Sequence, residues 1–137
     1  MPTEFDSNFR NTLVHGYVHD EAASFMGGIS GNAGLFGNAE SIGILLQDLD
    51  SKNGVFKQST IEKFTSYAFN NTSVRRGLGF DKPYQNKEQG TYPNLNLSKK
   101  SYGHTGFTGT MFWVDPPKEL TIVFLTNRVY PLSLIHI

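Results

Sequence analysis

Glycines that recur every three residues within residues 102–117 constrain the fold of this chain more than any other feature of its sequence. Gly103, Gly106 and Gly109 have a spacing that suits neither an amphipathic helix nor a long packed strand. Glycine at such positions lets another backbone or a ligand approach the main chain closely. A histidine and a threonine stand between the first two glycines, so the run has the composition of the edge of a functional site.

The residues after the glycines predict a β-hairpin. Residues 110–114 are strand-like, residues 115–117 (Asp-Pro-Pro) form a turn sequence, and residues 120–126 form a second strand-like run. The second run is apolar at the positions of both faces, which is typical of a buried central strand. We therefore expect the glycine run to adjoin a sheet whose last strand is covered on both sides.

Two helices are predicted upstream of the hairpin. Residues 39–50 place four apolar side chains on one stripe of a helix, namely Ile42, Leu45, Leu46 and Leu49. A capping-box sequence over residues 59–62 (Ser-Thr-Ile-Glu) predicts the start of a second helix, and residues 75–80 predict a short strand. Helices combined with hairpin strands indicate a mixed α/β (α+β) fold class.

Composition excludes several classes of function. Twelve basic and twelve acidic residues balance, so nothing draws the chain to nucleic acid or to an anionic membrane. The absence of cysteine excludes disulfides, thiolate metal sites and a cysteine nucleophile. No run approaches the roughly 20 apolar residues of a membrane span, and the first residues lack a signal-peptide pattern. We expect no nucleic-acid partner and no membrane span.

Two histidines four residues apart, His15 and His19, form the densest polar cluster near the N-terminus. On one helical face they could bind zinc, with Asp20 or Glu21 as a further ligand. However, Gly16 weakens such a helix, and the His-Glu-x-x-His pattern is absent. We expect no metal here, and interpret the cluster as a hydrogen-bonded turn that leads into a helix.

The glycine run and its surroundings resemble a known superfamily. The sequence His104-Thr105-Gly106 is similar to the third motif, Lys/His-Ser/Thr-Gly, of the serine β-lactamases and penicillin-binding proteins. Its continuation, with Asp-Pro at 115–116 and Leu-Thr-Asn-Arg at 125–128, resembles the class C-like branch. The sequences of residues 2–6, 18–21 and 31–36 look most like those of the β-lactamase-type domain found beside bacterial β-N-acetylglucosaminidase-type glycoside hydrolases.

This resemblance implies a fold and its limits in the chain. We expect a partial β-lactamase/transpeptidase-like fold, with antiparallel strands and packed helices, in which residues 1–131 form the C-terminal part of the domain. A preceding part of the same domain is then an implied partner. Residues 132–137 fit poorly, since similar chains continue into a polar stretch and a C-terminal helix. They are interpreted as an atypical, truncated or foreign tail.

The resemblance also implies roles for the residues of the third motif. His104 would donate a hydrogen bond or charge toward a substrate carboxylate or assist proton transfer, the alternative being a structural histidine that caps the strand. Thr105 would hydrogen-bond the substrate, and Gly106 would permit its close approach. The backbone N–H of Phe107 would be one of two donors that stabilise an oxyanion.

A second glycine-rich stretch, residues 27–37, matches no phosphate-binding spacing and no nucleophile elbow. In similar chains the corresponding loop lines the substrate cleft. Gly34 and Leu35 are therefore candidate substrate-binding residues, with a tight structural turn as the alternative interpretation. Two Tyr-x-Asn sequences, at 84–86 and 92–94, match the superfamily's second motif in form, but they lie too close to the third motif to serve as it.

The superfamily's nucleophile is absent from the sequence. No serine is followed three residues later by lysine, and arginine at that position remains charged and cannot act as a neutral base. The resemblance implies acyl-serine hydrolysis of an amide or ester, for example in cell-wall peptides, β-lactams or simple esters, without metal or organic cofactor. This chain alone is expected to be inactive, and a non-catalytic cell-wall peptide-binding module or scaffold segment is the alternative. The residues themselves do not give a compartment, but family resemblance implies the periplasm or cell envelope.

Overall fold

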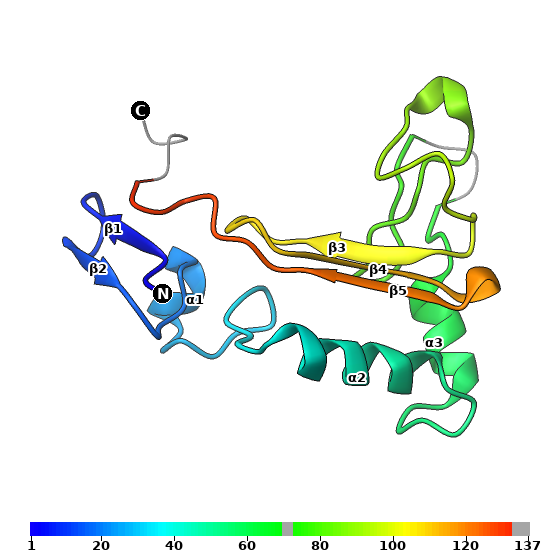
Figure 1. Ribbon diagram of the computed structural model, residues 1–137, viewed down its shortest axis with the longest axis horizontal. Coiled ribbons are helices and arrows are strands. Elements are labelled where there is room, and N and C mark those ends of the chain that lie inside the picture. The colour runs from blue at the N-terminus through cyan, green and yellow to red at the C-terminus, as the bar shows by residue number, and fades with distance from the viewer. Residues whose placement is uncertain (70–72, 133–137) are drawn as a thin grey trace. The chain divides into compact units, whose positions relative to one another are not determined.

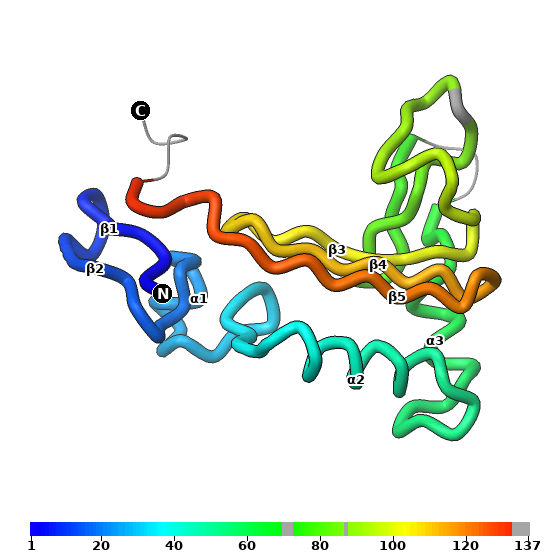
Figure 2. Tube along the Cα trace, viewed as in Figure 1, coloured from blue at the N-terminus to red at the C-terminus, as the bar shows by residue number. Residues whose placement is uncertain are grey.

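The computed structural model describes residues 1–69 and 73–132, and it divides into two compact units. The first unit contains residues 1–38, the turn Gly106–Thr110 and the chain from Leu125 onward. The second contains Ala39–Thr105 and Met111–Phe124. The glycine run therefore belongs to both units: its strands lie in the second and the turn between them in the first. Figure 2 shows the path of the chain, coloured by residue number.

A three-stranded antiparallel sheet forms the centre of the second unit (Figure 1). Its strands are β3 (Tyr102–Thr105), β4 (Met111–Asp115) and β5 (Leu120–Phe124), in that order across the sheet. The hairpin predicted from the sequence is confirmed, with Trp113 opposite Ile122 in its register. The strand β3 was not predicted, because its glycine removes the side-chain pattern by which a strand is recognised.

Helix α2 (Ala39–Asp50) packs against this sheet and helix α3 (Gln58–Thr65) against α2, which confirms the mixed α/β class. The core consists of Leu46 with Tyr102 and Val114. Five further apolar residues pack around it: Ile42, Leu49, Phe80, Phe112 and Val123. Leu45 is an exception to the predicted stripe, being about half exposed.

The predicted capping box of α3 does not form. Helix α3 begins at Gln58, with Lys57 at the N-cap and no capping side chain. Ser59 therefore lies inside the first turn, where it cannot cap. Residues 75–80 form no strand either: only single β-bridges join Arg76 to Asp81 and Asp81 to Gly103.

The prediction that residues 120–126 form a buried central strand is wrong. Strand β5 lies at the edge of the described sheet, and three side chains on one of its faces are exposed: Leu120, Ile122 and Phe124. Apolar residues on both faces allow a strand to be buried on both sides, but they do not ensure it. Here only the face toward α2 is covered.

The first unit contains the hairpin of β1 (Glu4–Asp6) and β2 (Thr12–Val14) and the short helix α1 (Glu21–Phe25). The strands were not expected in a segment of such polar composition. The expected turn into a helix is confirmed, because the Asp20 side chain caps α1 by accepting from the N–H of Ala23 at 2.8 Å.

Two short 3-10 turns, Lys87–Gln89 and Pro116–Lys118, complete the secondary structure. Within the described ranges, no helix is long and apolar enough to cross a bilayer. Of the predicted atypical tail, Leu132 is half exposed, and residues 133–137 lie outside the described residues.

Candidate functional site

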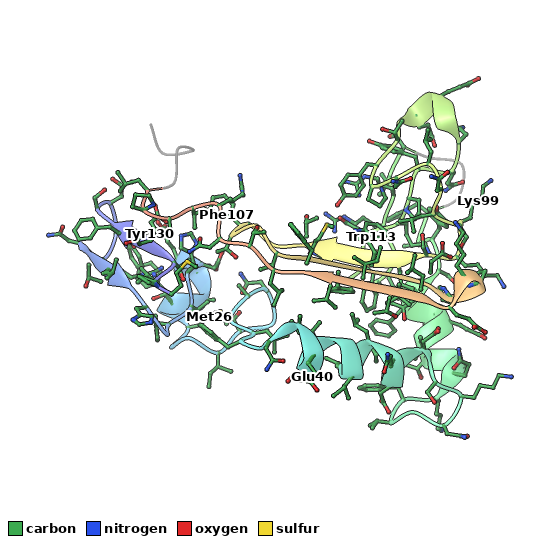
Figure 3. The ribbon with its side chains drawn as sticks, in the orientation of Figure 1. Met26, Glu40, Lys99, Phe107, Trp113 and Tyr130 are labelled. Carbon is green, nitrogen blue, oxygen red and sulfur yellow. The ribbon has the colours of Figure 1, made fainter. Side chains whose placement is uncertain are left out.

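The motif residues His104 and Thr105 end strand β3, and Gly106 and Phe107 begin the turn that leads to β4. Phe107 is labelled in Figure 3. Backbone hydrogen bonds fix this turn, from the N–H of Gly106 to the carbonyl of Thr110 at 2.7 Å and from Gly109 to Gly106 at 3.1 Å. The four predicted catalytic residues are thus consecutive at the end of one strand.

The glycines of the motif are needed because the protein's own atoms lie against them. A side chain at Gly103 would begin 2.5 Å from the Trp113 ring and would overlap the Phe112 carbonyl. At Gly109 the φ angle is +105°, and a side chain would begin 2.6 Å from the hydroxyl of Thr126. Gly103 and Gly109 are therefore required by the tight packing of the strand and the turn, whether or not a ligand approaches the backbone there.

Both ring nitrogens of His104 are engaged within the second unit. Nδ1 lies 2.7 Å from the carbonyl oxygen of Thr105, and Nε2 lies 3.1 Å from Nη1 of Arg76. A carbonyl can only accept a hydrogen bond, and a guanidinium can only donate one. These partners assign the proton to Nδ1 and leave Nε2 as an acceptor, so His104 is neutral in this arrangement.

Behind His104 lies a charged cluster around the buried carboxylate of Asp81. This carboxylate forms an ion pair with Arg76 and a second one with Arg75 at 3.4 Å. It also accepts from the hydroxyl of Tyr92 at 3.3 Å. Asp81 is held beside the motif because its backbone exchanges two hydrogen bonds with Gly103, at 2.7 and 3.1 Å.

Phe107, in the first unit, has a different setting. Its carbonyl accepts from Nε of Arg128 at 2.7 Å, and the Arg128 guanidinium lies 5.0 Å from the centre of its ring. The ring also stacks on that of His19. Among the described residues, no acceptor is found for the Phe107 backbone N–H, so this donor is available to a ligand.

The two N-terminal histidines have different surroundings. His19 pairs with the carboxylate of Glu4, and His15 is exposed. Among residues 1–69 and 73–132, no three metal-binding side chains gather at one point. The role of His19 is instead to join the buried Glu4 to the ring of Phe107.

The two candidate substrate-binding residues also lie in the first unit. Gly34 has a φ angle of +106°, and a side chain there would begin 3.0 Å from the carbonyl of Gly28. This supports the interpretation of a tight turn at Gly34. The side chain of Leu35, by contrast, is 84% exposed and is free to contact a ligand.

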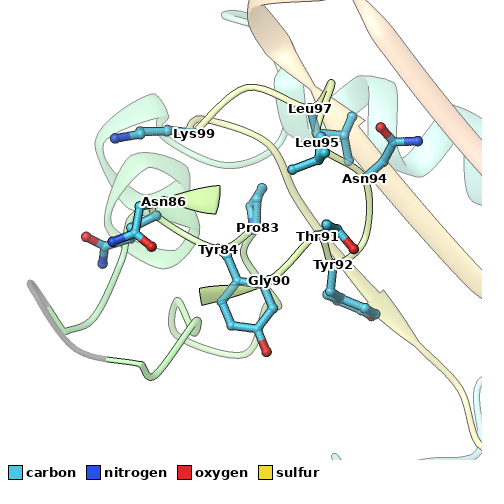
Figure 4. Close-up of a pocket in the computed structure, with 11 residues that line it drawn as sticks. Pro83, Tyr84, Asn86, Gly90, Thr91, Tyr92, Asn94, Leu95, Leu97 and Lys99 are labelled. Carbon is cyan, nitrogen blue, oxygen red and sulfur yellow. The ribbon is translucent and has the colours of Figure 1, made fainter. Parts of the chain in front are cut away.

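A pocket of about 210 Å³ lies in the loop between Pro83 and Lys99 (Figure 4). Its walls contain both Tyr-x-Asn sequences, through Tyr84, Asn86, Tyr92 and Asn94. None of the predicted catalytic residues lines it, so this loop pocket is separate from the motif.

The residues that surround the motif could not be predicted from the sequence. Arg76 is 28 positions from His104, and Arg128 is 21 positions from Phe107. No periodicity or motif connects residues at such separations. One local signal was available: adjacent arginines followed by an aspartate at residue 81 indicate an ion-pair cluster.

Comparison with known proteins places this chain in a family. A family model described as Beta-lactamase matches residues 5–134. In Escherichia coli strain K12, a protein named "Putative D-alanyl-D-alanine carboxypeptidase" is 35% identical over 142 aligned residues, covering 92% of this chain and 32% of the relative. In Bacillus subtilis strain 168, a protein named "N-acetylmuramyl-L-alanine amidase" is 38% identical over 127 residues, covering 88% of this chain and 28% of the relative. This chain thus spans about a third of the length of the curated relatives it matches. No solved structure gave a significant match.

Proposed function

Because this chain belongs to the beta-lactamase family, we propose that it forms part of a serine hydrolase that cleaves an amide bond in cell-wall peptides. The names of the Escherichia coli and Bacillus subtilis relatives support the choice of substrate, since one refers to D-alanyl-D-alanine and the other to N-acetylmuramyl-L-alanine. The nucleophilic serine and its lysine base would lie outside these 137 residues, since Ser-x-x-Lys is absent from them.

The observation that carries this proposal is the unpartnered backbone N–H of Phe107, immediately after the His-Thr-Gly motif. When a serine oxygen attacks the substrate carbonyl, the C–O π electrons move onto the carbonyl oxygen. A fixed N–H donor stabilises that negative charge, and loss of one such donor typically costs about 3 kcal/mol of barrier. The hydrogen bond from Arg128 to the Phe107 carbonyl holds this turn in place.

The other motif residues have supporting roles in the same step. The exposed hydroxyl of Thr105 would hydrogen-bond the substrate backbone, and the bare backbone of Gly106 would let the substrate approach. The exposed Leu35, which follows the tight turn at Gly34, would contact the substrate in the first unit. The proton of the serine would pass to the leaving amine, and water would then hydrolyse the acyl-serine to restore the enzyme.

The proposed substrate implies a location. Cell-wall peptides lie outside the cytoplasmic membrane, so we propose that the complete protein acts in the periplasm or cell envelope. No metal or organic cofactor enters the proposed steps, because the charge on the substrate carbonyl is stabilised by backbone donors.

The test is covalent labelling of the gene product that carries this sequence. Incubation with a fluorophosphonate or a penicillin should add the mass of one acyl or phosphonyl group to a serine, as read by mass spectrometry of the intact protein and its peptides. Substitution Thr105→Ala should slow penicillin acylation, whereas Thr60→Ala, on the exposed side of α3, should leave it unchanged.

The same experiment distinguishes the hydrolase from the alternative function, a non-catalytic binding module. Binding of a cell-wall peptide without any serine adduct would overturn the hydrolase and support a non-catalytic binding module. Absence of both binding and adduct would leave only a scaffold role.

A further inference from the structure

The walls of the loop pocket are held in place by the protein's own contacts (Figure 4). The backbone N–H of Tyr84 donates to the carbonyl of Tyr92 at 3.4 Å, which joins two sides of the loop. The Arg75 guanidinium lies 3.9 Å from the centre of the Tyr92 ring and 5.6 Å from that of Tyr84. A side chain at Gly90 would begin 2.7 Å from the Tyr84 ring, so the backbone packs directly on it. The pocket is therefore braced before any ligand arrives.

The lining of the loop pocket is polar but almost uncharged. Of the eleven described residues that line it, Lys99 alone carries a charge. Three of them carry carboxamides, namely Gln85, Asn86 and Asn94. A phosphate site gathers several cationic or backbone donors, and a site for a hard cation uses carboxylates. The lining therefore suits an uncharged ligand that is rich in hydrogen-bonding groups.

Two of the carboxamides are anchored so that their amino groups remain as donors. Oδ1 of Asn86 accepts from the backbone N–H of Gln89 at 3.0 Å, and Oδ1 of Asn94 accepts from that of Asn96 at 2.9 Å. Both asparagine side chains are exposed, and within residues 1–69 and 73–132 neither Nδ2 has a protein partner. Figure 4 shows the two side chains on opposite sides of the pocket. A ligand between them would meet a donor from each side.

The size and the apolar part of the lining narrow the ligand further. At about 210 Å³ the pocket is smaller than the roughly 300–1,000 Å³ of sites for drug-sized ligands, so it suits one small ring rather than an extended peptide. Leu97 and the half-exposed Leu95 add apolar surface. A pyranose sugar has oxygens around its edge and C–H groups on its faces, and an N-acetyl group adds a carbonyl acceptor and a methyl group. An N-acetylated sugar therefore matches both parts of the lining.

The loop pocket is connected to the strand that carries the motif. The hydroxyl of Tyr92, in the pocket wall, donates to the carboxylate of Asp81 at 3.3 Å. The backbone of Asp81 in turn exchanges two hydrogen bonds with Gly103, which directly precedes His104. All of these residues belong to the second unit. A sugar in the pocket and a peptide at the motif can therefore be parts of one substrate.

We propose that the loop pocket binds an N-acetylhexosamine ring of the glycan to which a cell-wall peptide is attached, through the Nδ2 donors of Asn86 and Asn94. It would be an accessory subsite, separate from the motif, in which no bond is made or broken. This inference rests on the proposed function, to which it adds a second point of attachment for the substrate. A peptide that still carries its sugars should then bind more tightly than the same peptide alone.

Two trisaccharides test the ligand class by binding titration with the complete gene product. They are tri-N-acetylchitotriose and maltotriose, which has no acetamido group. The wild type should bind the N-acetylated sugar at least about fivefold more tightly, the effect of one neutral hydrogen bond. Absence of binding, or equal affinities for the two sugars, would overturn the proposal.

Asparagine-to-aspartate variants test the two donors without removing the loop's own hydrogen bonds. Asn86→Asp and Asn94→Asp keep an oxygen for the backbone N–H and replace the Nδ2 donor by an acceptor. Each should weaken binding of tri-N-acetylchitotriose about fivefold. Asn53→Asp makes the same change at an exposed position between α2 and α3, and should have no effect. An unchanged affinity in both pocket variants would contradict the assignment.

A second pair of ligands tests whether the sugar belongs to the substrate. The same cell-wall peptide is titrated with and without its disaccharide of N-acetylated sugars. The wild type should bind the disaccharide form at least about fivefold more tightly, and Asn94→Asp should reduce this difference while leaving the affinity for the free peptide unchanged. Equal wild-type affinities would show that the pocket takes no part in substrate binding.

Failure of this inference can be told apart from failure of the proposed function. Sugar binding needs no nucleophilic serine, so the titrations are independent of fluorophosphonate labelling. Selective sugar binding without a serine adduct would reject the hydrolase alone. A serine adduct without selective sugar binding would reject the subsite alone.

Discussion

The imidazole ring of His19 stacks on the phenyl ring of Phe107, with 5.6 Å between their centres and 18° between their planes. The Arg128 side chain contacts both the ring and the carbonyl of Phe107. Phe107 is thus held by residues from both ends of the sequence. This contact set fixes the peptide whose N–H we propose as the oxyanion donor.

Substitution Arg128→Gln should therefore slow acylation without weakening substrate binding. The Phe107 carbonyl loses its donor, while the backbone bond from Arg128 to Thr108 at 2.9 Å remains. We expect kcat to fall about tenfold with little change in KM, because a misplaced donor is felt mainly in the transition state. Stopped-flow acylation by a fluorescent penicillin measures this, with Lys52→Gln as the control. An equal rise in KM would show that Arg128 binds the substrate instead.

Two glycine-to-alanine substitutions, one in strand β3 and one in helix α2, test how tightly the sheet is packed. Gly103→Ala should destabilise the protein by about 1–3 kcal/mol, because the added carbon meets the Trp113 ring and the Phe112 carbonyl. Gly43→Ala, in the middle of α2 with no atom within 4 Å, should stabilise it by about 0.5–1 kcal/mol. Urea unfolding of the two variants gives both values. Equal effects would mean that β3 relaxes away from β4 at little cost.

The buried Lys82 predicts a rise in stability at alkaline pH. Burial lowers the pKa of Lys82 from 10.5 to about 8, although the nearby Asp115 opposes this shift. Between these two values the unfolded chain holds one proton more than the folded chain, so the free energy of unfolding rises with pH. Across the whole window the gain is about 3 kcal/mol.

Urea unfolding of the wild type and of Lys82→Met, at pH 7 and pH 9.5, isolates this contribution. The wild type should gain stability relative to the variant as the pH rises. Measurements above pH 10 are unsuitable, because burial raises the pKa of Tyr102 to about 12 and ionisation of the unfolded tyrosine then lowers stability. Parallel pH profiles for the two proteins would contradict the assignment to Lys82.

What could be predicted from the sequence depended on how local the signal was. The helix at 39–50 and the hairpin around residues 115–117 were predictable, because apolar spacing and turn residues act within a few positions. The close packing at Gly103 and Gly109 was predictable in kind, since glycine spacing indicates a backbone that other atoms approach closely. The chemical setting of the motif was not predictable, because the contact of Arg76 with His104 depends on how Asp81 pairs with β3. Lys82 was missed for the same reason: a lysine in a polar loop gives no sign that it is buried.

Strand β5 has a practical consequence for handling this chain by itself. Its outer edge carries backbone donors and acceptors that no described strand pairs, and Leu120, Ile122 and Phe124 are exposed beside it. An open edge next to apolar side chains is a template on which further strands add. Produced as an isolated polypeptide, the chain will tend to self-associate, and its yield of monomer will depend on keeping that edge occupied.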